Sequence, residues 1–105
     1  MLIPHRKPIT IGRCLREDYI EPLGLTQTQL AEAMGVSRVT VSELCLDKRS
    51  VTRETATLLA AALGTTPEFW LNLQHLTELW ELKNSKPLRD RAAKVTRLAP
   101  DVAAA

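Results

Sequence analysis

Apolar residues recur at helical spacing along most of the chain, and each such stretch is bounded by residues that start or end helices. Between Thr52 and Gly64, the apolar residues Ala56, Leu59, Ala60 and Leu63 lie on one helix face. Thr52 is suited to an N-cap, and Gly64 to the left-handed residue that ends a helix. The same reasoning predicts five helices, which cover residues 11–20, 27–34, a short stretch after the cap Ser37, 53–63 and 67–82.

This pattern predicts an all-α chain in three parts. Residues 1–10, which contain two prolines, form an N-terminal arm, residues 11–82 form the folded domain, and residues 83–105 form a basic, partly flexible C-terminal tail. In the tail, one short helix after Pro87 is expected to carry Leu88, Ala92, Val95 and Ala99, and the last several residues are expected to fray. A chain of 105 residues with 45% hydrophobic and 25% charged residues suits one small domain.

Charge and hydropathy narrow the expected partners. No apolar run reaches the roughly 20 residues that cross a bilayer, and the polar start lacks the apolar stretch of a signal peptide. We therefore expect a cytoplasmic protein without membrane contact. Residues 52–82 are acidic, whereas the tail is basic, and such asymmetry usually concerns partners rather than the fold.

The segment from Gln27 to Leu44 has the pattern of a helix-turn-helix. Ala31 stands where two helices must approach closely, and Gly35 can adopt the left-handed turn between them. The apolar residues that would hold the two helices together are Leu30, Met34, Val36, Val41 and Leu44. The second helix then projects its outer face from the domain, as a DNA-reading helix must.

The outer face of that second helix carries side chains that can read base edges. Arg38 is the best candidate because a guanidinium can bond guanine O6 and N7, and Val39 can touch a thymine methyl. The full set of candidate base-reading residues is Ser37, Arg38, Val39, Ser42 and Glu43. The alternative for Arg38 and Glu43 is that they are ordinary solvated residues on a surface helix.

Phosphate contacts are expected at helix starts and in the basic stretch after the second helix. Free N–H groups and the positive dipole end of a helix attract phosphate, and Lys or Arg adds charge. The candidate phosphate-binding residues are Thr26, Gln27, Thr40, Lys48 and Arg49. Lys48 and Arg49 also fit the alternative of an ordinary basic loop.

The predicted helix over residues 67–82 has two apolar faces. One stripe, expected to face the domain, consists of Phe69, Leu73, Leu76 and Trp80. The second face, assigned to a homodimer interface, consists of Trp70, Leu71, Leu79 and Leu82. A monomer of this size cannot cover both faces. The alternative is that the tail or the N-terminal arm folds over the second face.

The sequence gives little support for an enzyme active site or a cofactor site. Cys14 and Cys45 are too few and too far apart for a disulfide framework or a thiolate metal site, so they are interpreted as small buried residues. His5 and His75 have no ligand spacing, and no phosphate-binding glycine loop or nucleophile motif occurs. We expect no enzymatic activity, no metal, no cofactor and no small-molecule ligand.

Three segments resemble one family. They are residues 16–26, with Glu-Pro-Leu-Gly-Leu, residues 30–38, with Leu-Ala-Glu-Ala-Met-Gly-Val-Ser-Arg, and residues 66–74, with Pro-Glu-Phe-Trp-Leu-Asn-Leu-Gln. Together they are similar to the HigA-type antitoxins within the lambda-repressor-like (XRE) class. The chain departs from that family in two places: Thr10-Ile11-Gly12-Arg13 replaces His-Pro-Gly-Glu before the first helix, and Leu46-Asp47 replaces an Asn-Gly turn. Asp47 can still adopt the left-handed conformation, at some cost.

The resemblance implies a five-helix, lambda-repressor-like DNA-binding domain that forms a homodimer and binds an inverted repeat in its own promoter. It also implies a HigB-like toxin partner that cleaves mRNA on the ribosome. Such a toxin needs a basic surface to hold RNA, so Glu78 and Glu81 are the candidate toxin contacts, with a solvated helix face as the alternative. The rival functions are a free-standing repressor without a toxin and a toxin-neutralising protein that no longer binds DNA.

Overall fold

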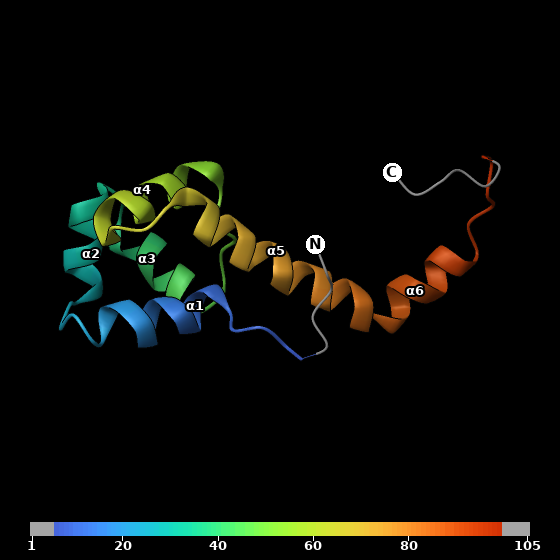
Figure 1. The fold of residues 1–105 in the computed structure, drawn as a ribbon, viewed down its shortest axis with the longest axis horizontal. Coiled ribbons are helices and arrows are strands. Elements are labelled where there is room, and N and C mark those ends of the chain that lie inside the picture. The colour runs from blue at the N-terminus through green and yellow to red at the C-terminus, as the bar shows by residue number, and fades with distance from the viewer. Residues whose placement is uncertain (1–5, 100–105) are drawn as a thin grey trace.

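The computed structural model describes residues 6–99, and every regular element within that range is helical (Figure 1). The helices are α1 (Ile11–Cys14), the π-helical segment η1 (Leu15–Ile20), α2 (Gln27–Met34), α3 (Arg38–Cys45), α4 (Arg53–Leu63), α5 (Pro67–Asn84) and α6 (Lys86–Ala93). The described part of the chain is therefore all-α, as predicted, but the expected count of five helices is not confirmed, because the predicted first helix is divided into α1 and η1 and α6 follows α5. None of the helices in this range is both long and apolar enough to cross a membrane.

The helix boundaries follow from local capping chemistry. Thr26 accepts a hydrogen bond from the Gln29 N–H at 3.0 Å, and its own N–H donates to the Gln29 side chain, so the predicted capping box is present. Gly35 and Gly64 end α2 and α4 in the left-handed conformation, each with a φ of 72°. Thr66 caps α5, whose first residue is a proline, as predicted.

The sequence misplaced the helices at the C-terminal end. Helix α5 continues to Asn84, two residues beyond the predicted end, and Pro87 lies in the first turn of α6. A proline is tolerated there because the first-turn N–H groups have no partner within the helix. Val95 and Ala99 lie beyond the end of α6, so they do not share the expected apolar stripe with Leu88. The residues expected to fray lie largely outside the described range.

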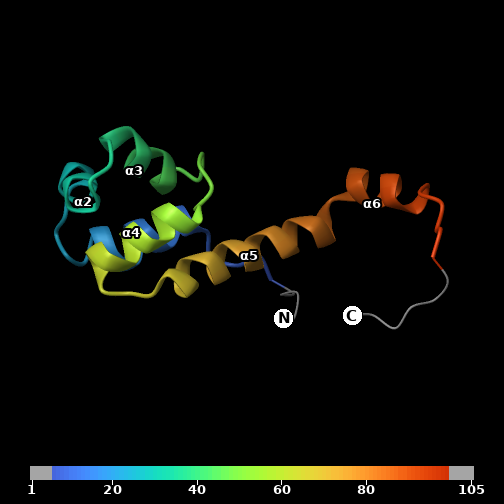
Figure 2. The ribbon, with the colours of Figure 1, turned by 90° about the horizontal axis from the view of Figure 1, so that it is seen from above.

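The hydrophobic core lies between α1–η1, the helix-turn-helix, α4 and the first turns of α5. Leu15, Val41, Leu44, Leu59 and Trp70 are completely buried there. Figure 2 shows these helices gathered into one bundle at the N-terminal end of α5. This bundle fixes the position of α3 relative to the other helices.

The prediction that Trp70 lies at a dimer interface is wrong. The Trp70 ring is completely buried in the core of the same chain, and its indole N–H donates to the Thr65 hydroxyl at 2.7 Å. Leu71 is half-buried and packs against the same core. Phe69, expected to face the domain, is instead 40% exposed. Leu73, from the stripe predicted to face the domain, packs against the core as Leu71 does, so residues of both predicted stripes contact the bundle.

The C-terminal half of α5 and all of α6 project from the bundle (Figure 1 and Figure 2). The Cα radius of gyration is 17.2 Å, above the roughly 13 Å expected of a compact domain of this length. Leu82 and Leu88 lie on this projecting arm, and both are exposed. We call residues 78–93 the α5–α6 arm.

Candidate nucleic-acid interface

Helix α3 is held so that its first turn faces solvent. Its inner side buries Val41, Leu44 and Cys45 in the core, and α2 packs against it across the Gly35 turn. The Val36 N–H donates to the carbonyl of Ala31 at 3.0 Å, which closes the turn between the two helices. This arrangement is the predicted helix-turn-helix, with α3 in the position of the recognition helix.

The most exposed side chains of α3 are those of its first turn. Arg38 and Val39 are exposed, and Val39 is 63% accessible although it is apolar. Ser42 and Glu43, one turn later, are half-buried. The first turn of α3 therefore presents a guanidinium and an apolar contact to whatever approaches this face.

Hydroxyl groups cap the helices that would approach a phosphate backbone. Ser37 accepts from the Thr40 N–H at 3.2 Å, and the two hydroxyl oxygens are 3.0 Å apart. Thr26 caps α2 in the same way. Gln27, the first residue of α2, is half-buried. Each cap uses one N–H group of the first helical turn, and the other N–H groups of that turn have no partner within the helix, which suits an anion.

Glu43 and Arg49 form an ion pair with each other. The guanidinium of Arg49 donates to the Glu43 carboxylate at 3.0 Å. The sequence predicts that Glu43 reads bases and that Arg49 contacts phosphates. Any base contact by Glu43 must compete with this pair, whereas Arg49 has other N–H groups that can still reach a phosphate.

Residues 46–51, which we call the clamp loop, carry Lys48 and Arg49 from α3 to α4. Both side chains are exposed. At the far end of the loop, the side-chain amide of Gln74 on α5 binds both main-chain groups of Val51: its NH₂ group donates to the carbonyl at 2.9 Å, and its oxygen accepts from the N–H. The clamp loop is therefore anchored on α5 as well as on α3 through Arg49.

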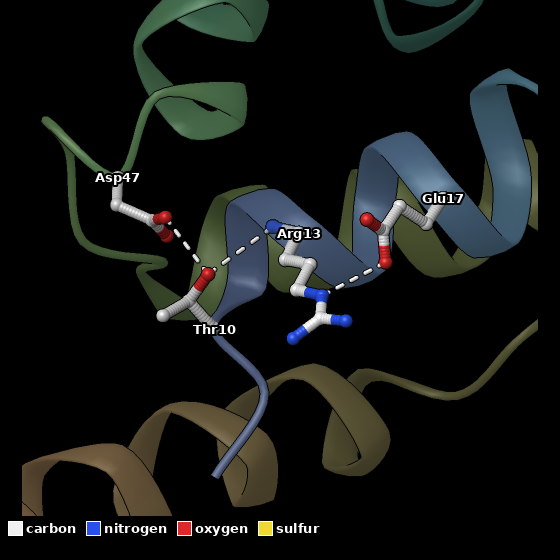
Figure 3. Close-up of polar contacts among 4 residues, drawn as sticks. All are labelled: Thr10, Arg13, Glu17 and Asp47. Carbon is white, nitrogen blue, oxygen red and sulfur yellow. Dashed lines mark hydrogen bonds and ion pairs between the residues drawn. The ribbon is translucent and has the colours of Figure 1, made fainter. Parts of the chain in front are cut away.

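A third anchor joins the clamp loop to the start of α1 (Figure 3). One oxygen of the Asp47 carboxylate accepts from the Gly12 N–H at 2.8 Å, and the other accepts from the Thr10 hydroxyl at 2.8 Å. Thr10 in turn caps α1 by accepting from the Arg13 N–H at 3.2 Å. Asp47 has a φ of 57°, so the sequence-based expectation that it adopts the left-handed conformation is confirmed.

Gly12 allows α1 to approach the C-terminus of α3 closely because it has no side chain. A Cβ at this position would lie 2.4 Å from the carbonyl oxygen of Cys45, at the C-terminus of α3. Sequence reasoning noted Gly12 and Asp47 only as neighbours of departures from the family pattern, and it missed Gln74. An aspartate in a position that demands a left-handed residue was the one signal that could have identified the anchor.

The two thiols are structural. Cys14 and Cys45 are buried, and neither is in a disulfide. Burial, together with a hydrogen bond to Asp18, raises the pKa of Cys14 to about 11, and burial also raises the pKa of Cys45. The interpretation of both as small buried residues is confirmed. Among residues 6–99, no group of three or more His, Cys, Asp or Glu side chains is arranged to hold a metal ion, and His5 lies outside this range.

Two acidic residues of α5, Glu78 and Glu81, line two clefts, one of which lies beside the clamp loop. Glu78 and Glu81 are exposed and border a cleft of about 240 Å³ whose opposite wall includes Lys48 and Arg49. They also border a second cleft, of about 430 Å³, whose apolar wall is formed by Leu82 and Leu88 on the α5–α6 arm. Leu79, the remaining residue of the predicted interface, is half-buried.

Comparison with known proteins agrees with this architecture. A helix-turn-helix family model matches residues 17–70. The chain is 51% identical over 79 residues to Antitoxin HigA-1 of Vibrio cholerae, with 75% of this chain and 74% of that protein aligned. The structure of antitoxin GraA in complex with its operator matches with a TM-score of 0.78 and 33% identity, over 95% of this chain and 100% of that chain.

A further solved structure, Pseudomonas aeruginosa antitoxin HigA with the higBA promoter, matches with a TM-score of 0.75 and 25% identity over 88% of this chain and 99% of that chain. None of these names is that of an enzyme, in agreement with the expectation from the sequence. The matched region contains the bundle that presents α3. The chain therefore belongs to the helix-turn-helix family, and within it to the HigA-type antitoxins.

Proposed function

We propose that the chain is an antitoxin that binds operator DNA through α3 and thereby represses its own operon. The observation that carries this proposal is the exposed first turn of α3, where Arg38 and Val39 project from a helix whose inner face is locked in the core. Two similar proteins, GraA and the HigA of Pseudomonas aeruginosa, have been solved with operator or promoter DNA. That likeness supports the same groove-reading role for α3 here.

Within this interface, we assign different roles in DNA binding to α3 and to the clamp loop. Ser37, Arg38, Val39 and Ser42 contact base edges, and Glu43 does so only when its pair with Arg49 opens. The residues assigned to phosphates are Thr26, Gln27, Thr40, Lys48 and Arg49. Base contacts discriminate between sequences, whereas phosphate contacts strengthen binding to all of them.

Two single variants separate these roles. Arg38→Ala should weaken binding to the chain's own promoter by about 1–3 kcal/mol and relax discrimination at one base pair. Lys48→Ala should weaken binding to every sequence alike and reduce the salt slope by about 1. The measurement is fluorescence anisotropy with a panel of promoter variants at several salt concentrations. Identical behaviour of the two variants across the panel would refute the assignment.

The proposed DNA-binding unit is a homodimer formed through the α5–α6 arm. The arm projects from the bundle, and it leaves Leu82 51% exposed beside Leu88. The described part of the N-terminal arm, residues 6–10, does not remove this exposure, although the Lys7 ammonium lies 5.7 Å from the centroid of the Trp80 ring. A two-fold dimer would place two α3 helices about 34 Å apart, one DNA turn, on an inverted repeat.

Sedimentation velocity tests the dimer. The wild-type chain should sediment as a dimer at micromolar concentration, and Leu82→Glu should shift it toward monomer because a carboxylate would be buried in the apolar contact. Leu98→Glu is the matched control, since Leu98 is 94% exposed and lies beyond α6. A wild-type monomer, or a footprint over only one half-site, would contradict the proposal.

We further propose that Glu78 and Glu81 contact a basic, mRNA-cleaving, HigB-like toxin that the chain neutralises. Their exposure and their position between two clefts support this role. The double variant Glu78→Lys and Glu81→Lys should slow toxin association, most strongly at low salt, and leave operator affinity almost unchanged. Surface plasmon resonance at two salt concentrations measures this, and an unchanged rate at low salt would refute it. Deletion of residues 84–105 tests the basic tail as the competing contact.

The chief alternative is a free-standing repressor with no toxin. A small basic reading frame of about 90–100 residues directly upstream, a typical size for one compact domain, would favour the antitoxin, and its absence would favour the repressor. The other alternative, a toxin-neutralising protein without DNA binding, predicts no shift of the promoter fragment in a gel.

A further inference from the structure

Asp47 has a main-chain conformation that is unfavourable for its residue type. Its φ of 57° is the only positive φ at a non-glycine residue among residues 6–99. The left-handed conformation is strained for a residue that carries a side chain, whereas glycine has no such penalty. The aspartate side chain must therefore supply something that glycine would not.

The Asp47 carboxylate joins the clamp loop to the start of α1 through two hydrogen bonds. Both carboxylate oxygens are used, one by the Gly12 N–H and the other by the Thr10 hydroxyl, each at 2.8 Å. Hydrogen bonds to a charged carboxylate are stronger than those between neutral groups. Because Thr10 and Gly12 are at the beginning of α1, which packs on α3, these bonds fix the loop against the bundle.

Lys48 and Arg49 follow Asp47 directly, so its anchor controls where they point. The Lys48 N–H donates to the carbonyl of Glu43 at 2.8 Å, and the Arg49 guanidinium is drawn toward Glu43. These contacts hold the loop to α3 alone. Asp47 is the only residue of the loop, within the part of the chain that the structure describes, whose side chain bonds to α1 or its cap.

We propose that Asp47 is a positioning residue for DNA binding: by tying the clamp loop to Thr10 and Gly12, it orders Lys48 and Arg49 before they meet the phosphate backbone. This inference rests on the proposed operator binding and adds to it a residue that does not touch DNA. Ordering two long side chains in advance removes an entropy loss that binding would otherwise include.

The charge of Asp47 alone would have the opposite effect on the affinity for DNA. Asp47 is negatively charged and lies beside two proposed phosphate contacts, so removing its charge should strengthen binding to DNA. A positioning role predicts that removing its hydrogen bonds weakens binding. The direction of the effect therefore separates the two explanations.

The test compares Asp47→Gly with Asp47→Asn. Glycine adopts the observed φ without strain, so that variant should fold, but it loses both bonds. Asparagine tolerates the same conformation, and its oxygen can accept from Gly12 while its NH₂ group donates to Thr10. With the chain's own promoter fragment, Asp47→Gly should bind about tenfold more weakly than wild type. Asp47→Asn should bind at least as tightly as wild type.

A double-mutant cycle excludes a general loss of structure. In a chain that already carries Lys48→Ala and Arg49→Ala, Asp47→Gly should change affinity by less than about twofold, because the side chains that it positions are gone. The single Asp47→Gly variant should also lose part of the salt slope, toward the value of that double variant. Thermal unfolding of each variant checks that it is folded.

Three outcomes of these binding measurements would overturn the positioning role of Asp47. If wild type binds the promoter and Asp47→Gly binds equally or more tightly, the positioning role is overturned and the proposed function stands. If Asp47→Gly has its full effect without Lys48 and Arg49, the role is merely structural and the inference is overturned. If wild type itself does not bind the promoter, the proposed function fails and this inference fails with it.

Discussion

Replacing Gly12 by alanine is the sharpest test of how α1 is packed. The added Cβ would lie 2.4 Å from the carbonyl oxygen of Cys45 and 2.8 Å from a carboxylate oxygen of Asp47. The first of these atoms belongs to the main chain of α3, so no side-chain rotation can relieve the contact. Helix α1 must move by about 1 Å to restore an ordinary van der Waals distance.

The size of the effect follows from three contributions. Overpacking a close contact costs about 1–3 kcal/mol, and breaking the Gly12 hydrogen bond to a charged carboxylate costs about 1.5–3 kcal/mol. The higher helix propensity of alanine returns up to about 1 kcal/mol. Gly12→Ala should therefore lower the free energy of unfolding by about 1.5–6 kcal/mol, a large part of the 5–15 kcal/mol typical of a domain.

Urea denaturation followed by circular dichroism, at one fixed protein concentration, measures this difference. Gly64→Ala is the matched control: a Cβ there would meet nothing within 4 Å, but the φ of 72° is strained for alanine. The control should lose only about 1 kcal/mol. A Gly12→Ala variant within 0.5 kcal/mol of wild type, on the order of the scatter of neutral surface changes, would refute the close approach of α1 to α3.

Three further predictions concern buried groups. Thr65→Val leaves the buried indole N–H of Trp70 without its acceptor and should cost about 1–3 kcal/mol, whereas Thr57→Val, on an exposed face, should change the free energy of unfolding by less than about 0.5 kcal/mol in the same urea titration. Cys14 and Cys45 should resist alkylation by iodoacetamide at pH 8 in the native chain, because burial blocks access and raises both thiol pKa values. Both thiols should react readily in urea. Mass spectrometry measures the alkylation, and rapid reaction of the native chain would contradict the prediction. Because the pKa of Cys14 is higher in the folded chain than its ordinary value of 9.0, its contribution to stability should be constant below that pH and should decline as the pH rises toward 11.

Local chemistry in the sequence was sufficient to locate most helices. Thr26, Thr52 and Thr66 cap their helices, and Gly35 and Gly64 end theirs, at the predicted positions. Caps depend on residues three or four positions apart, so a linear reading captures them. The helix-turn-helix was predictable for the same reason: its small residue, its glycine and its apolar set all fall within one short segment.

Contacts between distant segments could not be read in this way. A helical wheel identified two apolar faces on α5, but only packing decided that Trp70 and Leu71 face the core, since the bundle covers the first turns of α5 and the rest projects beyond it. The anchor of Asp47 on Thr10 and Gly12 spans more than 30 residues, so no local pattern links its partners. The sequence thus determined most of the helices and the helix-turn-helix, because these depend on neighbours along the chain. The tertiary structure alone decided which apolar residues of α5 are buried and how the clamp loop is held, because both depend on which segments meet in space.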